Sequence, residues 1–259
     1  MQRPAADSRL ALAGLGVLVT RPAHQAQALC ELLLAAGASV ERLPLLAVEP
    51  AGDEADLAAR LRQAHRRDHW IFTSANAARQ AARLDAGPWP LLAAAGAATA
   101  AALGEAGHGG ALVPAGLDGA AGLLADPRFA APAGSRILIV TGDNTLPELA
   151  SGLRARGAEV EVLAVYRRVP VAHAPEAVTQ ALAASQVAIV SSGEALAHLL
   201  ALTPASARER LLSLQLALPS PRMIEKARVA GFTQTPLLPA RVSDAAYVDL
   251  LERWRKKDG

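Results

Sequence analysis

The chain has few cysteines, few aromatic residues and little net charge. Its 259 residues include one cysteine and two tyrosines, and aromatic residues make up 3% of the sequence. Because a disulfide needs two cysteines, the single Cys30 excludes an internal disulfide framework and favours a reducing, cytoplasmic location. The net charge is only +2, so the chain is not a polycation and we expect no nucleic acid as partner.

Sequence motifs of several common chemistries are also absent. The chain has no GxxxxGK[ST] phosphate loop, no GxGxxG after a strand and no GxSxG nucleophile elbow. His65 and His69 have i,i+4 spacing, but they lie in RLRQAHRRDH beside four arginines. This setting favours a solvated basic helix end over a metal site.

No segment is expected to enter a membrane. The uncharged stretch 87–104 contains two prolines and is mostly alanine and glycine, which is typical of a strand, a turn and a helix start. Apolar residues make up 52% of the chain, which is enough to build real cores. Cys30 has helical spacing to Leu33 and Leu34, so we interpret it as a buried core thiol.

The sequence contains the same pattern twice. Residues 17–43 read VLVTRPAHQAQALCELLLAAGASVERL, and residues 138–163 read LIVTGDNTLPELASGLRARGAEVEVL. WIFTSANAARQAA, which starts at Trp70, is echoed by VAIVSSGEALAHLL, which starts at Val187. This A-B-A′-B′ order predicts two similar α/β domains that face one another across a ligand cleft. The repeats leave open whether the first A segment belongs with B or with B′.

Apolar runs and helix-length segments alternate along the chain. Strands are expected at 16–20, 39–43, 70–73, 91–95, 111–113, 136–140, 159–163, 187–190, 214–218 and 235–238. Helices are expected near 23–36, 54–65, 75–84, 97–106, 118–124, 145–156, 175–183, 193–201, 205–211, 221–230 and 244–256. Continuous apolar strands suit parallel sheets covered on both faces, so the predicted fold class is α/β and flavodoxin-like.

Small polar residues follow the expected strands. Such turns contain Thr20-Arg21, Thr73-Ser74, Gly96 to Thr99, Thr141-Gly142, Ser191-Ser192 and Ser220-Pro221-Arg222. In parallel sheets these turns share one edge of each sheet. Hydroxyl groups there either cap the following helix or, together with free amides, hold a carboxylate or phosphate. A single turn favours capping, whereas six turns on two edges favour an anion site.

Tyr166 is the second candidate group. It lies just past the expected strand 159–163 in VLAVYRRVP, and Leu46 stands at the matching place of the first repeat. Both segments are expected to be crossings between domains. A tyrosine there donates a proton or a hydrogen bond without carrying charge. The alternative, that its ring only packs in the linker, is equally compatible with the sequence.

Taken in order, these segments resemble the uroporphyrinogen-III synthase family. The resemblance rests on VLVTRP, WIFTSANA, GAATAAAL, the Leu-x-x-x-Gly-Ala-x-Val…VYRR stretch and SSGEAL, and it spans roughly residues 16–256. No single motif is specific, and the ordered set carries the likeness. Two other classes stay open: a two-domain small-anion binding protein without catalysis, and an interaction module of response-regulator or flavodoxin type.

The resemblance implies a fold and a reaction. The family has two α/β domains joined by a two-stranded connector, which here implies a discontinuous domain of 1–45 plus 170–259 and an inserted domain of 46–169. Its enzymes are hydro-lyases (EC 4.2.1.75) that close hydroxymethylbilane, a linear tetrapyrrole polycarboxylate, into uroporphyrinogen III. Ring D is inverted, water is lost, and no metal or organic cofactor is used. We expect a monomer, and transient contact with hydroxymethylbilane synthase stays open.

The resemblance also assigns roles to residues. Tyr166 matches the family tyrosine proposed as the acid near the departing hydroxyl. The residues that match substrate-binding turns are Arg21, Thr73, Ser74, Thr99, Gly142, Ser191, Ser192 and Arg222. The turn that holds Gly142 often reads Arg-Gly in the family, but Thr141 replaces the arginine here, which puts one anion contact in doubt.

Overall fold

The structure is a computed structural model of the chain. It describes residues 10–117, 119–130, 132–143 and 147–258. The side chains of residues 257 and 258 are not described. No helix within these ranges combines the length and the apolar character needed to cross a lipid bilayer.

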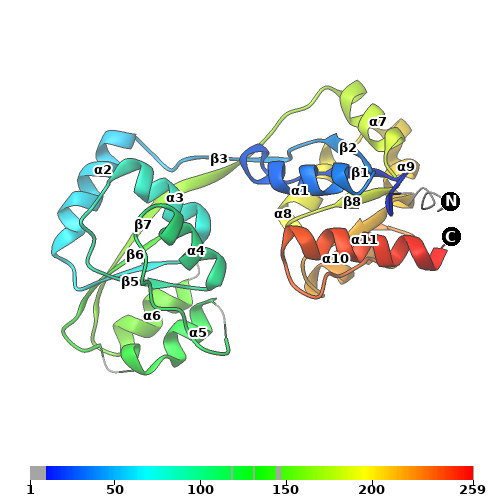
Figure 1. Ribbon diagram of the computed structural model, residues 1–259. Coiled ribbons are helices and arrows are strands. Elements are labelled where there is room, and N and C mark those ends of the chain that lie inside the picture. The colour runs from blue at the N-terminus through cyan, green and yellow to red at the C-terminus, as the bar shows by residue number, and fades with distance from the viewer. Residues whose placement is uncertain (1–9, 118, 131, 144–146, 259) are drawn as a thin grey trace, which may run out of the picture. The chain divides into compact units, whose positions relative to one another are not determined.

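The chain divides into two compact units. Unit 1 takes Met1–Ala47 and Pro170–Gly259, and unit 2 takes Val48–Val169. Strands β3 (Leu46–Pro50) and β7 (Glu159–Pro170) run across the two boundaries (Figure 1). Unit 1 is therefore assembled from both ends of the chain, and unit 2 is continuous.

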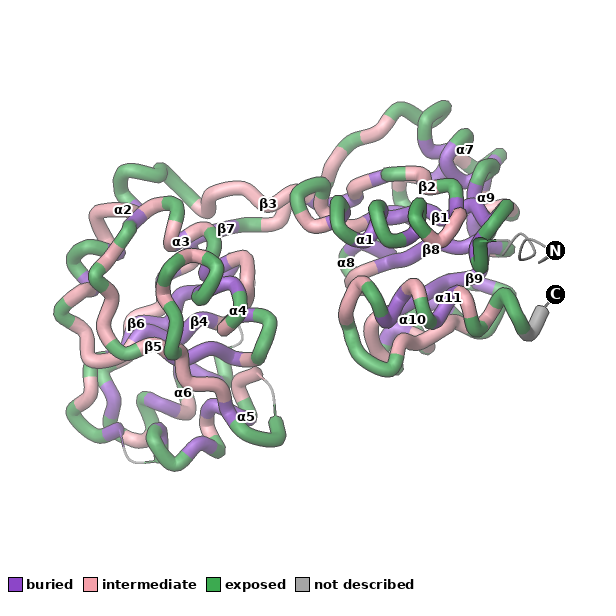
Figure 2. Tube along the Cα trace, in the orientation of Figure 1, coloured by how far each residue is buried: buried purple, intermediate pink, exposed green. Residues whose placement is uncertain are grey.

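The sheet of unit 1 is entirely parallel. Its order is β2-β1-β8-β9, with β1 at Gly16–Val19, β2 at Ser39–Arg42, β8 at Val187–Ile189 and β9 at Gln215–Ala217. Every residue of β1, β8 and β9 is buried, as Figure 2 shows. Such strands need apolar side chains on both faces, which explains their continuous apolar sequence.

Helices cover both faces of this sheet. One face packs against α1 (Ala23–Ala35) and α11 (Asp244–Asp258). The other face packs against α7 (Pro175–Ala184), α8 (Gly193–Leu202), α9 (Arg208–Ser213) and α10 (Arg222–Ala230). Cys30 lies in the α1 face at 4% exposure, which confirms the buried thiol, and this burial raises its pKa.

The sheet of unit 2 has the order β3-β7-β6-β4-β5. Strands β4 (His69–Phe72), β5 (Leu91–Ala94), β6 (Arg136–Gly142) and β7 are parallel to one another. Strand β3 is the exception. The bonds Ala51 N–H to Val165 O and Val171 N–H to Leu45 O run in opposite sequence order, so β3 and β7 are antiparallel.

Helices cover both faces of this sheet too. The first face packs against α2 (Glu54–Gln63), α3 (Ala75–Leu84) and α4 (Ala97–Glu105), and the second against α5 (Gly119–Ala125) and α6 (Pro147–Ala155). Short 3-10 turns lie at Ala64–Arg66, Pro127–Phe129 and Ala205–Ala207. The predicted α/β class, with parallel sheets flanked by helices, is confirmed.

Several expected elements differ in the structure. The strands expected at 111–113 and 235–238 are single bridges, Leu112 to Ala93 and Leu237 to Ala217, because only one residue of each pairs. Strand β7 continues past the expected end at 163 to Pro170, and β3 is an additional strand. The starts expected at 118 and 145 lie outside the described residues.

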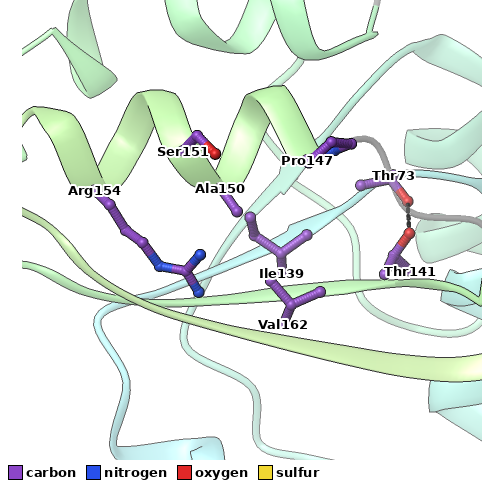
Figure 3. A pocket seen from close by; sticks show the side chains of 8 residues that line it. All are labelled: Thr73, Ile139, Thr141, Pro147, Ala150, Ser151, Arg154 and Val162. Atoms are coloured by element: carbon purple, nitrogen blue, oxygen red, sulfur yellow. Dashed lines mark hydrogen bonds between the residues drawn. The ribbon is translucent and has the colours of Figure 1, made fainter.

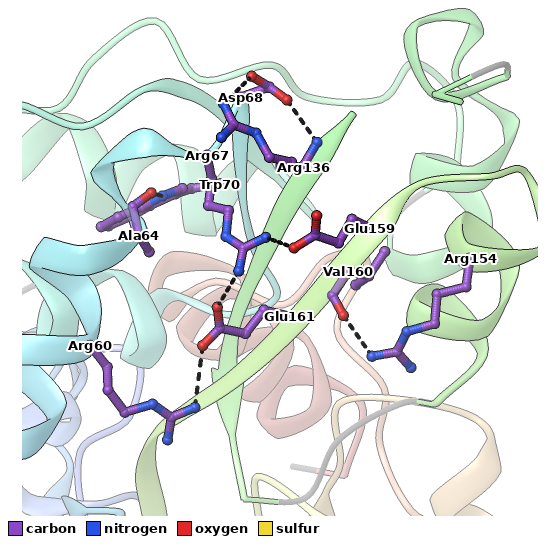
Figure 4. Close-up of polar contacts among 10 residues, drawn as sticks. All are labelled: Arg60, Ala64, Arg67, Asp68, Trp70, Arg136, Arg154, Glu159, Val160 and Glu161. Atoms are coloured by element: carbon purple, nitrogen blue, oxygen red, sulfur yellow. Dashed lines mark hydrogen bonds and ion pairs between the residues drawn. The ribbon is translucent and has the colours of Figure 1, made fainter. Parts of the chain in front are cut away.

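The basic segment before β4 ends α2 as predicted and leaves Arg62 and Arg66 exposed, but its other arginines are paired. It turns through the 3-10 segment into β4, so His65 and His69 lie on different elements. Figure 4 shows the arginines of this segment paired with acids of β7: Glu161 accepts from Arg67 at 2.9 Å and from Arg60 at 3.4 Å. Opposite charge at the amino ends of the strands therefore ties the loop to the sheet.

Candidate functional site

Each sheet has a point where the strand order reverses. In unit 2 the chain leaves β4 through α3 on the first face and leaves β6 through α6 on the second face. In unit 1 the chain leaves β1 through α1 and β8 through α8, again on opposite faces. Open α/β sheets bind ligands at the carboxyl ends of the strands at such a point. Most of the candidate residues lie there.

In unit 2 two threonines bridge this point. Thr73 Oγ1, after β4, donates to Thr141 Oγ1, in β6, at 2.7 Å (Figure 3). Both side chains line a cavity of about 190 Å³, whose wall is completed by α6 and by apolar side chains of β6 and β7. Ser151 and Arg154 add polar groups, although Arg154 already donates to Val160 O at 2.8 Å. The cavity therefore has hydroxyl groups at the sheet edge and a mainly apolar wall.

Ser74 and Tyr166 meet beside the threonine pair. Ser74 is the N-cap of α3, where its Oγ accepts the Ala77 N–H at 3.1 Å. The same Oγ lies 3.1 Å from the Tyr166 hydroxyl oxygen. The ring of Tyr166 is buried in the core beneath α3, so its hydroxyl reaches the sheet edge from within. A hydroxyl group that donates and accepts protons thus stands at a helix N-terminus.

The other two predicted residues of unit 2 have different surroundings. Thr99 lies in the first turn of α4, where its N–H donates to Gly96 O at 3.1 Å, and it is buried. It is not hydrogen bonded to the Ser74 and Tyr166 pair. Gly142 ends β6 and pairs with Tyr166 across the sheet. Four of the five unit 2 candidates therefore lie close together at this edge, namely Thr73, Ser74, Gly142 and Tyr166.

The corresponding edge of unit 1 also has hydroxyls, together with an arginine that is paired with an acid. Thr20 Oγ1 donates to Ile189 O at 2.9 Å and so bridges β1 and β8. Ser192 is the N-cap of α8, and its Oγ accepts the Ala195 N–H at 3.1 Å. Capping, the simpler of the two interpretations, is therefore correct for Ser74 and Ser192, and both remain at the edge where an anion would bind.

Arg21 is held inside unit 1. Its guanidinium forms an ion pair with Asp244 and lies 5.2 Å from the ring centroid of Tyr247. Burial raises the pKa of Tyr247, so its phenol stays neutral. Ser191 and Arg21 line one cavity of about 230 Å³. An anion that entered it would compete with Asp244 for the arginine.

Arg222 opens α10 and is exposed. Within the described part of the chain its side chain has no ion-pair partner, so its charge faces solvent. The turn before it uses backbone atoms alone: Met223 N–H donates to Ser220 O at 3.1 Å, and Pro221 stands at the N-cap without a side-chain bond. Across the described ranges, no three histidine, cysteine or acidic side chains gather as a metal site would require.

Three residues of these edges were not among the predicted site residues. Thr141 was named in a candidate turn and as a replacement for arginine but was not assigned a role, and its hydroxyl accepts a hydrogen bond from that of Thr73. The repeat aligns Thr141 with Thr20, and this was the available signal. Asp244 and Tyr247 hold Arg21, but they are separated from it by more than 200 residues, and no local pattern indicates the contact.

Comparison with known proteins decides between the classes left open. The family model described as "Uroporphyrinogen-III synthase HemD" matches residues 27–240 of the chain. The chain belongs to the uroporphyrinogen-III synthase family. Enzymes with that name are lyases of class EC 4.2.1.75 in porphyrin biosynthesis.

Relatives of this family align along almost the full chain. The uroporphyrinogen-III synthase of Salmonella typhimurium strain LT2 is 31% identical over 248 residues, covering 92% of this chain and 99% of the relative. The enzyme of Escherichia coli strain K12 is 30% identical with the same coverage. A simple binding module is therefore not favoured.

Solved structures share the fold. A mutant uroporphyrinogen III synthase of the extremely thermophilic bacterium Thermus thermophilus superposes with a TM-score of 0.60 at 20% identity, covering 95% of this chain and all of that one. The Helicobacter pylori 26695 protein gives a TM-score of 0.61 at 13% identity, covering 93% and 99%. At these identities the likeness speaks for the fold alone.

Proposed function

We propose that this chain closes hydroxymethylbilane into uroporphyrinogen III with inversion of ring D and loss of water. The observation that carries the proposal is the Tyr166 hydroxyl, 3.1 Å from Ser74 Oγ at the carboxyl edge of a sheet in a chain of this family. The edge holds a tyrosine hydroxyl beside other hydroxyl groups, and its described residues include no cysteine or lysine nucleophile. That set suits a reaction in which the substrate is already reactive and must be oriented.

The proposed chemistry needs one proton at one oxygen. The bond between the hydroxymethyl carbon and its oxygen breaks as the pyrrole nitrogen supplies electrons, and Tyr166 gives its proton to the departing oxygen, which leaves as water. The substituted carbon of the last ring then attacks the electrophilic carbon and forms a spirocyclic pyrrolenine. The bond from that ring carbon to the neighbouring methylene bridge breaks, and the released methylene, now electrophilic, bonds to the free α carbon of the same ring. That carbon loses its proton as the ring regains aromaticity, and the Tyr166 phenolate takes the proton up. The cycle therefore returns the acid to its first state.

The substrate carries eight carboxylates, so binding needs many donors rather than one strong site. In unit 2 the proposed donors come from Thr73, Ser74, Thr99 and the Gly142 turn. In unit 1 they come from Arg21, Ser191, Ser192 and Arg222. Arg222 is ready to bind because it is exposed and unpaired among the described residues, whereas Arg21 must first exchange Asp244 for a substrate carboxylate.

We further propose that the two units are the two domains of the enzyme and that each contributes part of the substrate contacts. The single buried cysteine suits a protein that works in the cytoplasm. No step of the proposed reaction is routed through a metal, an organic cofactor or a second copy of the chain.

The test is a coupled assay with isomer analysis. Porphobilinogen and hydroxymethylbilane synthase are incubated with and without this protein, the products are oxidised, and the porphyrin isomers are separated by chromatography. We expect isomer III with the protein and isomer I without it. Isomer I alone, from protein with a folded circular dichroism spectrum, would remove the proposed reaction and leave an anion-binding protein.

A further inference from the structure

Strand β7 does not keep a regular alternation of its side chains. Leu163 and Val165 face the core under α3, whereas Val160 and Val162 face the core under α6. Strict alternation would turn Tyr166 to the same side as Val162. Tyr166 instead lies in the core under α3, directly after Val165. Two neighbouring residues therefore point to the same face.

An irregularity in strand pairing explains this turn. Thr141 pairs with Ala164, but the next residue, Gly142, pairs with Tyr166. Val165 is thus an extra residue on β7, which makes a β-bulge. A bulge re-aims the side chains that follow it, and here it brings Tyr166 to the face that carries Ser74.

Gly142 makes room for the ring that the bulge has turned. A Cβ atom at this position would lie 2.6 Å from Cζ and 2.9 Å from the hydroxyl oxygen of Tyr166. These distances are below van der Waals contact, and the ring is only 8% exposed, so it has little space to move aside. The backbone at Gly142 has no positive φ, so the requirement for glycine is steric.

Ser74 contacts the hydroxyl group of Tyr166. Either hydroxyl can donate across the 3.1 Å contact between Ser74 Oγ and Tyr166 Oη, and when Ser74 donates, its Oγ still accepts the Ala77 N–H. Tyr166 then receives a hydrogen bond and keeps its own proton for another acceptor. The donor lies at the N-terminus of α3, where negative charge on the phenol oxygen is stabilised.

We propose that Gly142 and Ser74 are positioning residues for Tyr166: Gly142 seats its ring, and Ser74 orients its hydroxyl so that the proton points to substrate. This inference rests on the proposed function, and for Gly142 and Ser74 it replaces the substrate contacts proposed above with a role in positioning Tyr166. Both residues should therefore act on kcat and only through Tyr166. A substrate-contact role would instead raise KM.

The test for Gly142 is a double-mutant cycle in the isomer III assay. Y166F should lower kcat about 100-fold, and G142A about 10- to 100-fold with KM changed less than about threefold, because a displaced acid loses most of its effect. In the Y166F background G142A should cost almost nothing further in kcat. The steric part is read separately from thermal unfolding: G142A should lower Tm in the wild-type and Y166F backgrounds, which keep the ring, but not in the Y166A background, where the ring is gone.

The test for Ser74 separates its two hydrogen bonds. S74T keeps the cap and the hydroxyl donor and should retain kcat within about threefold. S74D keeps the cap but has no proton to donate, so kcat should fall about tenfold although the helix is capped. S74A loses both and should match S74D in kcat while also lowering Tm. In the Y166F background, S74D and S74A should not lower kcat further.

The outcomes distinguish this inference from the proposed function. Isomer I alone from wild type, or full kcat from Y166F, would remove the proposed reaction or its acid. If Y166F is impaired but G142A and S74D reduce kcat equally in both backgrounds, the reaction stands and the positioning role is wrong. An increase in KM with unchanged kcat for G142A would likewise overturn it in favour of a substrate contact.

Discussion

The two units are built on the same plan but differ in side chains at their sheet edges. The core strands follow the order β2-β1-β8-β9 in unit 1 and β7-β6-β4-β5 in unit 2. The capping serines have nearly the same backbone, with φ and ψ of −159° and 161° at Ser192 and −158° and 157° at Ser74. In the sequence repeat Arg21 of unit 1 stands at the place of Gly142 in unit 2, although the strand registers set Arg21 one residue earlier, level with Thr141.

Under the proposed function, this difference sets a binding arginine in unit 1 apart from the acid in unit 2. In unit 2 the ring of Tyr166 occupies the space that a side chain at position 142 would need. In unit 1 the matching Leu46 is buried in an apolar core, and Arg21 is held by Asp244 and the Tyr247 ring. The duplicated fold therefore presents small hydroxyls at both edges, whereas the contact between a glycine and the ring of Tyr166 belongs to unit 2.

Exchanging the two edge residues should give the largest effect. G142R fills the space of the Tyr166 ring, so we expect kcat for isomer III to fall by about 100-fold or more. The reverse exchange, R21G, removes an ion pair and a ring contact but leaves Tyr166 in place, and we expect its loss of kcat to be less than about tenfold. Both are measured in the coupled assay, with circular dichroism to check folding. Equal losses of kcat would break the comparison.

Cavities in matched central strands should test whether the units are stable independently. L138A in β6 and L18A in β1 each remove a fully buried side chain, and each should lower the free energy of unfolding by about 3 kcal/mol. Amide hydrogen exchange after each substitution should rise in the unit that carries it. A rise in both units from either variant would mean that they unfold as one.

The Arg21 ion pair should contribute modestly to unit 1. A double-mutant cycle with R21A and D244A, read by denaturant unfolding, should give a coupling of about 1 kcal/mol, because both side chains are partly exposed. About 1 M salt should reduce it. No coupling at low salt would mean that the pair leaves Arg21 free for substrate.

Acid should weaken unit 2 before unit 1, and this is the smallest effect. Among the described residues, carboxyl groups with a lowered pKa are Glu54, Asp68, Asp85 and Asp126 in unit 2, against Glu225 in unit 1. Hydrogen bonds from Arg128 lower the pKa of Asp126 to about 2. Because the folded pKa values lie below the unfolded ones, this stability is complete above about pH 5 and is lost as pH falls toward 2.

Hydrogen exchange between about pH 5 and about pH 2.5 measures this order unit by unit, with intrinsic rates corrected for pH. D126N should flatten the response of unit 2 in that window. Simultaneous loss of protection in both units would contradict the assignment.

Much of the fold was readable because its signals are local. The apolar runs of β1, β4, β6 and β8, the capping serines and the buried Cys30 follow from short-range pattern, burial and capping chemistry. The repeated pattern also brought attention to the strand ends where the hydroxyls gather. The strands expected at 111–113 and 235–238 are only single bridges at Leu112 and Leu237. An apolar run pairs as a strand only where a neighbouring strand is present along its length.

The sequence by itself determined the α/β class, the repeated layout and the residue types at both sheet edges, because these depend on periodicity and on side-chain chemistry. Tertiary structure alone decided the face of Tyr166. Alternation along β7 points it away from Ser74, and the bulge against β6 turns it back. The pairing of Arg21 with Asp244 was decided in the same way. Both depend on contacts between segments distant in the chain, whose packing selects among arrangements that local preference leaves equal.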